Sequence, residues 1–174
     1  MKRFGLYIYS ILLAVTIIGF FSCEKSESYP VEPQITYSNF RIFTDTGTLG
    51  NPKIIIELNF DFIDGDGDIG SYRVIGGYTE IVNSDTSKYD LYVQKYSFID
   101  TGFTAITDTG KYYLPYFEPE EKNSFLKGQT TVTLDYFNLK PDTFFYEFFI
   151  YDRKRHKSNI EYSDTLFLIP DSII

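Results

Sequence analysis

Apolar and polar residues alternate in short runs along most of this chain, and turn residues separate the runs. The clearest run extends from Lys53 to Ile63. Its apolar face carries Ile54, Ile56, Leu58, Phe60 and Phe62, and its polar face carries Glu57, Asn59 and Asp61. Because successive side chains of a strand point to opposite faces, this run predicts a half-buried β-strand. No stretch of helix length repeats its apolar residues with a helical period, so we expect an all-β fold.

Six or seven strands are expected in total. Thr130 to Tyr136 alternates in the same way, and Phe144 to Asp152 is apolar on both faces apart from Glu147, which is typical of a central strand. The remaining candidates are Ile35 to Phe43, Tyr89 to Phe98, Thr165 to Ile169 and, as the seventh, Tyr112 to Phe117. Short strands in this number favour a two-sheet antiparallel sandwich, with a small barrel as the alternative.

One segment points to a particular kind of sandwich. The sequence Leu139-Lys140-Pro141-Asp142-Thr143-Phe144-Phe145-Tyr146 resembles the segment that leads into the sixth strand of fibronectin type III domains. Phe145 stands in the place of the usual tyrosine, and Tyr146 follows one residue later. The resemblance implies an immunoglobulin-like or fibronectin-like arrangement of the strands.

The start of the chain predicts a secretion signal. Met1-Lys2-Arg3 is positively charged, residues 4–21 are apolar, and Ser22 precedes the single cysteine, Cys23. The apolar segment is also long enough for a transmembrane anchor, which is the alternative. Ile18-Gly19-Phe20-Phe21-Ser22-Cys23 resembles the lipobox of bacterial lipoprotein precursors. This resemblance implies that Cys23 becomes the lipid-modified first residue of the mature protein and attaches it to a membrane.

The expected domain organisation follows from this start. Residues 1–22 form the signal peptide, residues 23–33 a lipidated tether with Pro30 and Pro33, and residues 34–174 a single β-sandwich domain. Glu24 to Ser28 resembles the export signal of Bacteroidota lipoproteins that reach the cell surface. We therefore expect a protein of the bacterial cell envelope, an outer-membrane lipoprotein, on either the periplasmic or the surface side.

The composition of the chain limits the classes of partner that the domain is expected to bind. The formal net charge is −8, and it becomes −10 when Lys2 and Arg3 leave with the signal peptide. This acidic balance disfavours a nucleic-acid partner, because phosphate binders present positive charge. The 16 tyrosines and 17 phenylalanines exclude a disordered chain. One cysteine leaves no disulfide within the chain.

The most specific motif is Asp64-Gly65-Asp66-Gly67-Asp68-Ile69-Gly70, directly after the clearest strand. Carboxylates at alternate positions, separated by glycines that permit positive φ, can converge on one hard cation such as Ca²⁺. The spacing is not that of an EF-hand, because Ile69 stands at the sixth position and Ile75 at the twelfth. The alternative is a solvated turn. We take Asp64, Asp66 and Asp68 as candidate metal ligands.

A second polar segment, Asp152 to Asn159, follows the predicted central strand and contains Arg153, Lys154, Arg155 and His156. In a fibronectin-like sandwich this segment and the Asp64–Asp68 loop lie at the same end, which is also where the first strand starts. Two outcomes compete there. Asp152 or Asn159 completes the Ca²⁺ shell, or Arg153 and its neighbours neutralise the acidic loop and make a metal unnecessary. Alone, the segment is typical of a solvated hairpin turn.

Enzyme motifs are weak in this sequence. Asp-Thr-Gly occurs at Asp45, Asp100 and Asp108, and the segment around Asp100 resembles the active-site segment of aspartic proteases. That chemistry needs two such carboxylates at close range, and Asp-Thr-Gly is also good turn chemistry. A hydrolase is therefore the minor alternative, and no catalytic residue is assigned.

The expected role is binding or assembly. Tyr112, Tyr113, Tyr116 and Phe117 form a candidate surface for a glycan or a peptide, or for docking onto an outer-membrane complex as an accessory subunit; the alternative is that these rings complete the core. The lipobox, the aspartate motif and the later Asp152-Arg153 segment together resemble small Bacteroidota lipoproteins. That resemblance implies export and a β-sandwich but no particular activity.

Overall fold

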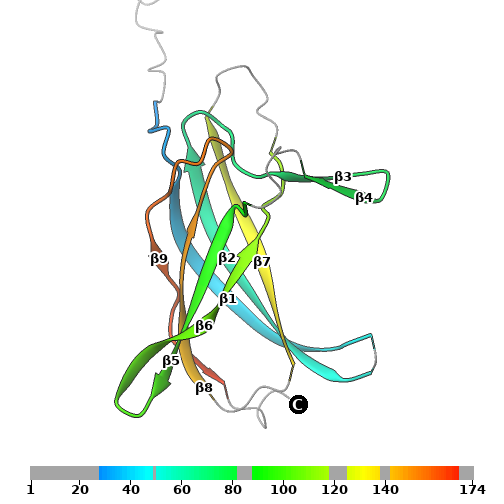
Figure 1. The fold of residues 1–174 in the computed structure, drawn as a ribbon, viewed down its shortest axis with the longest axis vertical. Coiled ribbons are helices and arrows are strands. Elements are labelled where there is room, and N and C mark those ends of the chain that lie inside the picture. Colours follow the sequence, from blue (N-terminus) through cyan, green and yellow to red (C-terminus); the bar gives the residue numbers. More distant parts are fainter. Residues whose placement is uncertain (1–27, 49, 82–87, 118–124, 138–141, 169–174) are drawn as a thin grey trace, which may run out of the picture.

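Two antiparallel sheets face each other in the computed structural model, which describes residues 28–48, 50–81, 88–117, 125–137 and 142–168 (Figure 1). The first sheet has the order β1-β2-β7, with strands at Gln34–Thr46, Pro52–Asp64 and Leu126–Phe137. The second has the order β10-β8-β5-β6, with β9 also paired to β8. Its strands are β5 (Leu91–Ile99), β6 (Gly102–Tyr112), β8 (Asp142–Ile150), β9 (Glu161–Tyr162) and β10 (Leu166–Leu168). The predicted all-β, two-sheet, immunoglobulin-like or fibronectin-like sandwich is confirmed.

The alternation seen in the sequence places the core. On β2, Ile56, Leu58, Phe60 and Phe62 are buried between the sheets. The second sheet contributes the alternate residues of β8, namely Phe144, Tyr146, Phe148 and Ile150. Since every second side chain of both strands enters one continuous cluster, burial of these apolar groups is the main stabilising term of the sandwich.

The predicted seventh strand, Tyr112 to Phe117, is wrong. β6 ends at Tyr112, and the residues after it run as an irregular segment with one isolated bridge from Pro115 to Tyr72. The strand in this region is β6, Gly102–Tyr112, which lies earlier in the sequence than expected and pairs with β5. Its sequence is polar and rich in threonine, so the apolar pattern did not indicate it. Asp100, in the turn between these strands, has a φ of 56°.

The fibronectin-like segment is partly described. Tyr146 is buried, and its hydroxyl lies 2.5 Å from the hydroxyl of Tyr136 near the end of β7. Phe145 is on the outer face of β8, stacked against Tyr96. Leu139, Lys140 and Pro141 lie outside the described residues.

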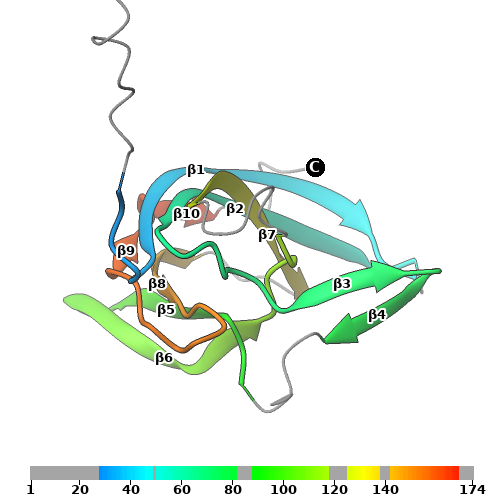
Figure 2. The ribbon, with the colours of Figure 1, turned by 90° about the horizontal axis from the view of Figure 1, so that it is seen from above.

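Several strands begin or end together at one end of the sandwich, which we call the tether end. Gln34 pairs with Ile63, and Leu91 pairs with Ile150, so the start of β1 lies beside the end of β2, and the start of β5 beside the end of β8. Close to this end a separate hairpin, β3 (Tyr72–Ile75) and β4 (Tyr78–Ile81), extends away from both sheets (Figures 1 and 2). We call this hairpin the arm.

Candidate metal centre

The aspartate loop, residues 64–70, folds back on itself where β2 ends. The backbone N–H of Asp68 donates a hydrogen bond of 2.7 Å to Oδ2 of Asp64. Gly67 has a φ of 67°, a conformation that side chains disfavour. The loop therefore turns its three carboxylates inward instead of spreading them into solvent.

Four carboxylates meet in this loop. Asp64, Asp66, Asp68 and Asp152 each offer one oxygen, and these four oxygens lie within 4.8 Å of one another. Asp64 and Asp152 are 0% exposed, and Asp68 is also buried. Oδ1 of Asp64, Oδ1 of Asp66 and Oδ1 of Asp68 are buried and have no hydrogen-bond partner. Since buried polar atoms are nearly always paired, three such oxygens in one place indicate a site for a cation.

Asp152 reaches the cluster from the other sheet, directly after β8. Its Oδ1 accepts a hydrogen bond of 2.7 Å from the backbone N–H of His156, and its Oδ2 lies 2.7 Å from Nδ1 of the same residue. The hydrogen bond to Asp152 raises the pKa of His156. His156 thus orients Asp152, a role that the sequence analysis missed although the spacing of four residues was visible.

The basic side chains act on the loop from outside the cluster. The Arg153 guanidinium donates hydrogen bonds of 3.0 Å to the carbonyls of Ile69 and Gly70. Lys154 is exposed, with its ammonium 2.5 Å from Oδ2 of Asp66 and 3.7 Å from Oδ2 of Asp68. Asp152 therefore joins the cluster, and Arg153 and Lys154 contact the same loop. The three Oδ1 oxygens still have no partner.

The carboxylates oppose one another's ionisation. Burial, followed by the charges of Asp66, Asp68 and Asp152, raises the pKa of Asp64 to about 7, although a hydrogen bond from Asp68 acts against this rise. Burial and the charges of Asp152 and Asp66 also raise the pKa of Asp68. Two carboxylates about 4 Å apart repel by about 4 kcal/mol at an effective dielectric of about 20. A cation at the centre would remove this repulsion and favour the fully ionised cluster.

The chain before β1 is attached to the same loop. The backbone N–H of Gly65 donates a hydrogen bond of 2.9 Å to the carbonyl of Pro30. A side chain at position 65 would collide with the backbone carbonyls of Tyr29 and Pro30, so only glycine allows this close approach. The candidate centre therefore lies where the predicted tether joins the domain.

Asn159, the other residue proposed from the sequence to complete the shell, has a different place in the structure. Its Oδ1 accepts a hydrogen bond of 2.8 Å from the N–H of Ile35, and its Nδ2 donates one of 2.9 Å to the carbonyl of Ile35. Nδ2 also donates to Glu161 at 3.0 Å. The carboxamide of Asn159 is thus engaged with the backbone N–H and carbonyl groups of β1. The expectation that Asn159 is a metal ligand is therefore corrected, and Asn159 is left out of the candidate centre.

The aromatic residues proposed as a binding strip are half-buried and face different neighbours. Tyr112 and Phe117 pack against the hydrophobic core. Tyr113 pairs with Tyr89, with ring centroids 4.8 Å apart. Tyr116 lies under the Arg153 guanidinium. The four rings thus pack against the core and the neighbouring loops, and they do not form one exposed surface.

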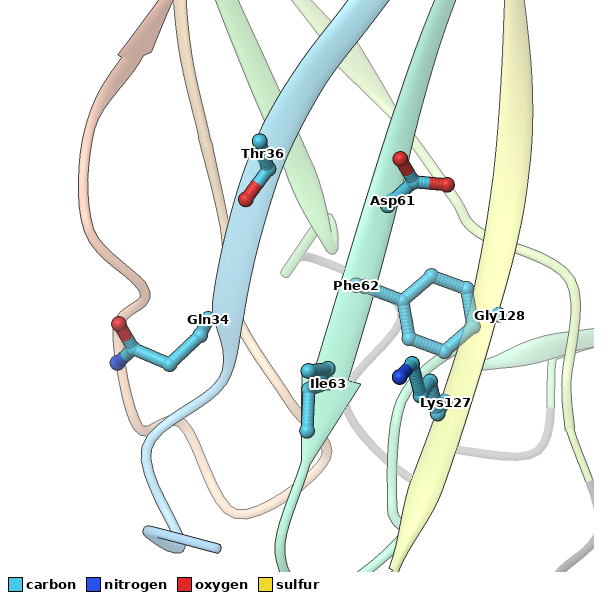
Figure 3. Close-up of a pocket in the computed structure, with 7 residues that line it drawn as sticks. All are labelled: Gln34, Thr36, Asp61, Phe62, Ile63, Lys127 and Gly128. Carbon is cyan, nitrogen blue, oxygen red and sulfur yellow. The ribbon is translucent and has the colours of Figure 1, made fainter.

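A groove with a volume of about 450 Å³ lies elsewhere, over the first sheet (Figure 3). The residues that line it come from β1, β2 and β7 and are Gln34, Thr36, Asp61, Phe62, Ile63, Lys127 and Gly128. It offers one carboxylate, of Asp61, and one ammonium group, of Lys127, and none of the four clustered aspartates. The groove and the candidate metal centre are thus separate features.

Comparison with known proteins gave no match: no protein-family model, no curated protein and no solved structure is similar to this chain at a significant level. Among the described residues there is no helix long and apolar enough to cross a membrane. The predicted signal peptide and Cys23 lie outside the described residues. Fold and site together define a class, a two-sheet β-sandwich with a four-aspartate candidate metal centre.

Proposed function

We propose that this chain is a lipid-anchored, non-catalytic binding or assembly protein of the bacterial cell envelope, and that Ca²⁺ bound by Asp64, Asp66, Asp68 and Asp152 stabilises its tether end. The observation that carries the metal part is the set of three buried, unpartnered carboxylate oxygens beside a fully buried fourth aspartate. The anchor part rests on the sequence around Cys23.

Ca²⁺ is the cation that these ligands suit best. All four donors are carboxylate oxygens, which hard cations prefer, and Ca²⁺ holds six to eight oxygens at about 2.3–2.6 Å in irregular geometry. Opposite oxygens around such an ion are about 5 Å apart, which matches a cluster whose oxygens lie within 4.8 Å of one another. Mg²⁺ needs a smaller, nearly octahedral shell and releases water reluctantly.

A bound ion would connect three parts of the chain. Asp64 ends β2 in the first sheet and Asp66 and Asp68 follow it, Asp152 follows β8 in the second sheet, and Pro30 is hydrogen-bonded to Gly65 inside the loop. Ca²⁺ would thus hold the two sheets together at the end where a lipid tether pulls on the domain. Such a cross-link between the sheets would resist separation of the two sheets in a protein attached to a membrane, and this role requires no catalysis.

Thermal unfolding in EGTA, in millimolar Mg²⁺ and in millimolar Ca²⁺ tests the metal part. An ion at about 100 times its Kd stabilises the fold by about 2.7 kcal/mol, or roughly 5–10 °C in Tm for a domain of this size. We expect Ca²⁺ to produce this shift and Mg²⁺ a smaller one. Equal melting temperatures in Ca²⁺ and EGTA would contradict the proposal.

Two matched variants make this test specific. Asp64→Asn removes a cluster charge, so it should abolish the Ca²⁺ shift while leaving Tm in EGTA equal or higher. Asp61→Asn changes an exposed carboxylate of the same strand, which accepts a hydrogen bond from the Ser38 hydroxyl. This variant should show the full Ca²⁺-induced shift in Tm. A Ca²⁺ shift retained by Asp64→Asn would place the ion elsewhere.

A further inference from the structure

The arm exposes apolar side chains at its tip. Tyr78 is 81% exposed, Val74 63% and Ile75 53%. Gly76 and Gly77, with φ of 59° and 85°, form the two-residue turn between the strands. Residues 74–78 carry no charge, and the nearest charged groups, Arg73 and Glu80, neutralise each other in an ion pair of 3.0 Å.

The base of the arm is fixed to the domain. The backbone N–H groups of Ser71 and Tyr72 both donate to the carbonyl of Leu114, at 3.1 Å. The Ser71 hydroxyl donates to the buried carboxylate of Asp90 at 2.5 Å. Arg153, which follows the cluster residue Asp152, bonds the carbonyl of Gly70. The base of the arm is therefore held by Leu114 and Asp90, and it follows directly after the loop that forms the candidate metal centre.

We infer that the arm is a membrane-contact element, whose Val74, Ile75 and Tyr78 insert into the bilayer to which Cys23 is attached. This inference rests on the proposed lipid anchor. Pro30 is held at the aspartate loop, and the chain from Cys23 to Pro30, eight residues joined by seven peptide links, extends at most about 25 Å. The anchor thus keeps the bilayer close to the tether end, and the arm leaves the body in that half of the molecule (Figure 1).

The small size of the tip favours lipid over protein as its occupant. Three side chains offer far less than the roughly 1,000 Å² that a stable protein interface buries. A bilayer imposes no such minimum, because a protein already attached by its lipid meets it at high effective concentration. An uncharged tip ending in tyrosine also suits the interface region, where aromatic residues with one polar end accumulate. A protein partner or a second copy of the chain is the competing occupant.

The chain contains no tryptophan, so Tyr78→Trp gives a single fluorescent probe at the tip. The full lipidated chain, purified in detergent, is reconstituted into vesicles of phosphatidylethanolamine and phosphatidylglycerol with brominated phosphatidylcholine as quencher. We expect the emission to shift to shorter wavelength and to be quenched. Phe167→Trp is the matched control, because Phe167 is also largely exposed but pairs with Thr143 at the opposite end; its emission should stay that of water.

A second variant and a flotation assay separate the possible failures. Val74→Ser with Ile75→Ser, in the Tyr78→Trp background, should still float with the vesicles but lose most of the quenching. If the Tyr78→Trp chain floats and its emission stays that of water, the arm inference is overturned and the anchor stands; a blue shift without quenching assigns the tip to protein and overturns it equally. If the chain does not float and matches Cys23→Ala, the anchor itself fails, and the inference fails with it.

Discussion

Carboxylates removed from full solvent contact occur at both ends of the sandwich, partly buried at the far end and largely buried at the tether end, and their partners differ. At the far end, Oδ2 of Asp142 accepts hydrogen bonds from the Lys95 ammonium at 2.7 Å and from the Ser97 hydroxyl at 3.0 Å. At the tether end, the aspartate loop concentrates four carboxylates and leaves three oxygens unpartnered. The far end therefore has one carboxylate paired with one ammonium group, whereas the tether end has four clustered carboxylates that share the exposed Lys154 ammonium and His156 and keep three oxygens without a partner.

The largest expected effect comes from breaking the far-end pair. Lys95→Met leaves Asp142 partly buried without its cation, and removal of one partner from a buried pair costs about 3 kcal/mol. Chemical denaturation in EGTA and in Ca²⁺ should give the same loss, because the group of acidic side chains found among the described residues that could hold a metal ion lies at the tether end. Recovery of the lost stability by Ca²⁺ would mean that the two ends are not distinct.

The next effect is a pH dependence confined to the tether end. The folded-state pKa of Asp64 is raised to about 7 from 3.8. Ionisation of Asp64 therefore destabilises the metal-free fold above pH 7, whereas near pH 4 this destabilisation is absent. Stability in EGTA should therefore fall as pH rises from about 4 to about 7 and then level off, with a loss of about 2 kcal/mol between pH 5 and pH 8. Denaturation at pH 5 and pH 8 measures it, and the Ca²⁺ increment should be larger at pH 8.

His156 changes stability in the same direction. Its pKa is raised by Asp152, so it stabilises the fold at low pH and loses this contribution as pH rises through its folded-state pKa. His156→Gln removes that contribution and leaves the one from Asp64. A metal-free stability that increases from pH 5 to pH 8 in this variant would contradict the assigned pKa of Asp64.

A smaller effect tests the corrected role of Asn159. Asn159→Ala removes two hydrogen bonds to the backbone of Ile35 and should destabilise the domain by about 1–2 kcal/mol, with an unchanged Ca²⁺ shift. Thermal unfolding with and without Ca²⁺ measures both. Loss of the Ca²⁺ shift would return Asn159 to the ligand set.

The smallest effect belongs to Lys154. Its ammonium contacts Asp66 and Asp68 from the solvent side, where ion pairs are weak and screened by salt. Lys154→Gln should therefore increase Ca²⁺ affinity slightly at low salt and not at high salt. A large loss of affinity would mean that Lys154 organises the loop.

The sequence was informative where side-chain alternation is strong. β2 and β8 were predicted because their apolar residues either alternate or fill both faces, and the closeness of Asp152 to the aspartate loop was implied by the resemblance to a fibronectin-like sandwich. β6 was missed because it pairs through a polar sequence, and the arm was missed because each of its strands has only four residues. Asn159 was misplaced because a carboxamide can serve a metal or a backbone, and spacing does not distinguish the two.

Calcium titration of the EGTA-stripped protein by calorimetry shows directly whether the four aspartates bind Ca²⁺. We expect one Ca²⁺ bound per chain, weaker binding of Mg²⁺, and no binding by Asp64→Asn. Absence of Ca²⁺ binding by the unmodified chain, with the fold intact by circular dichroism, would contradict it.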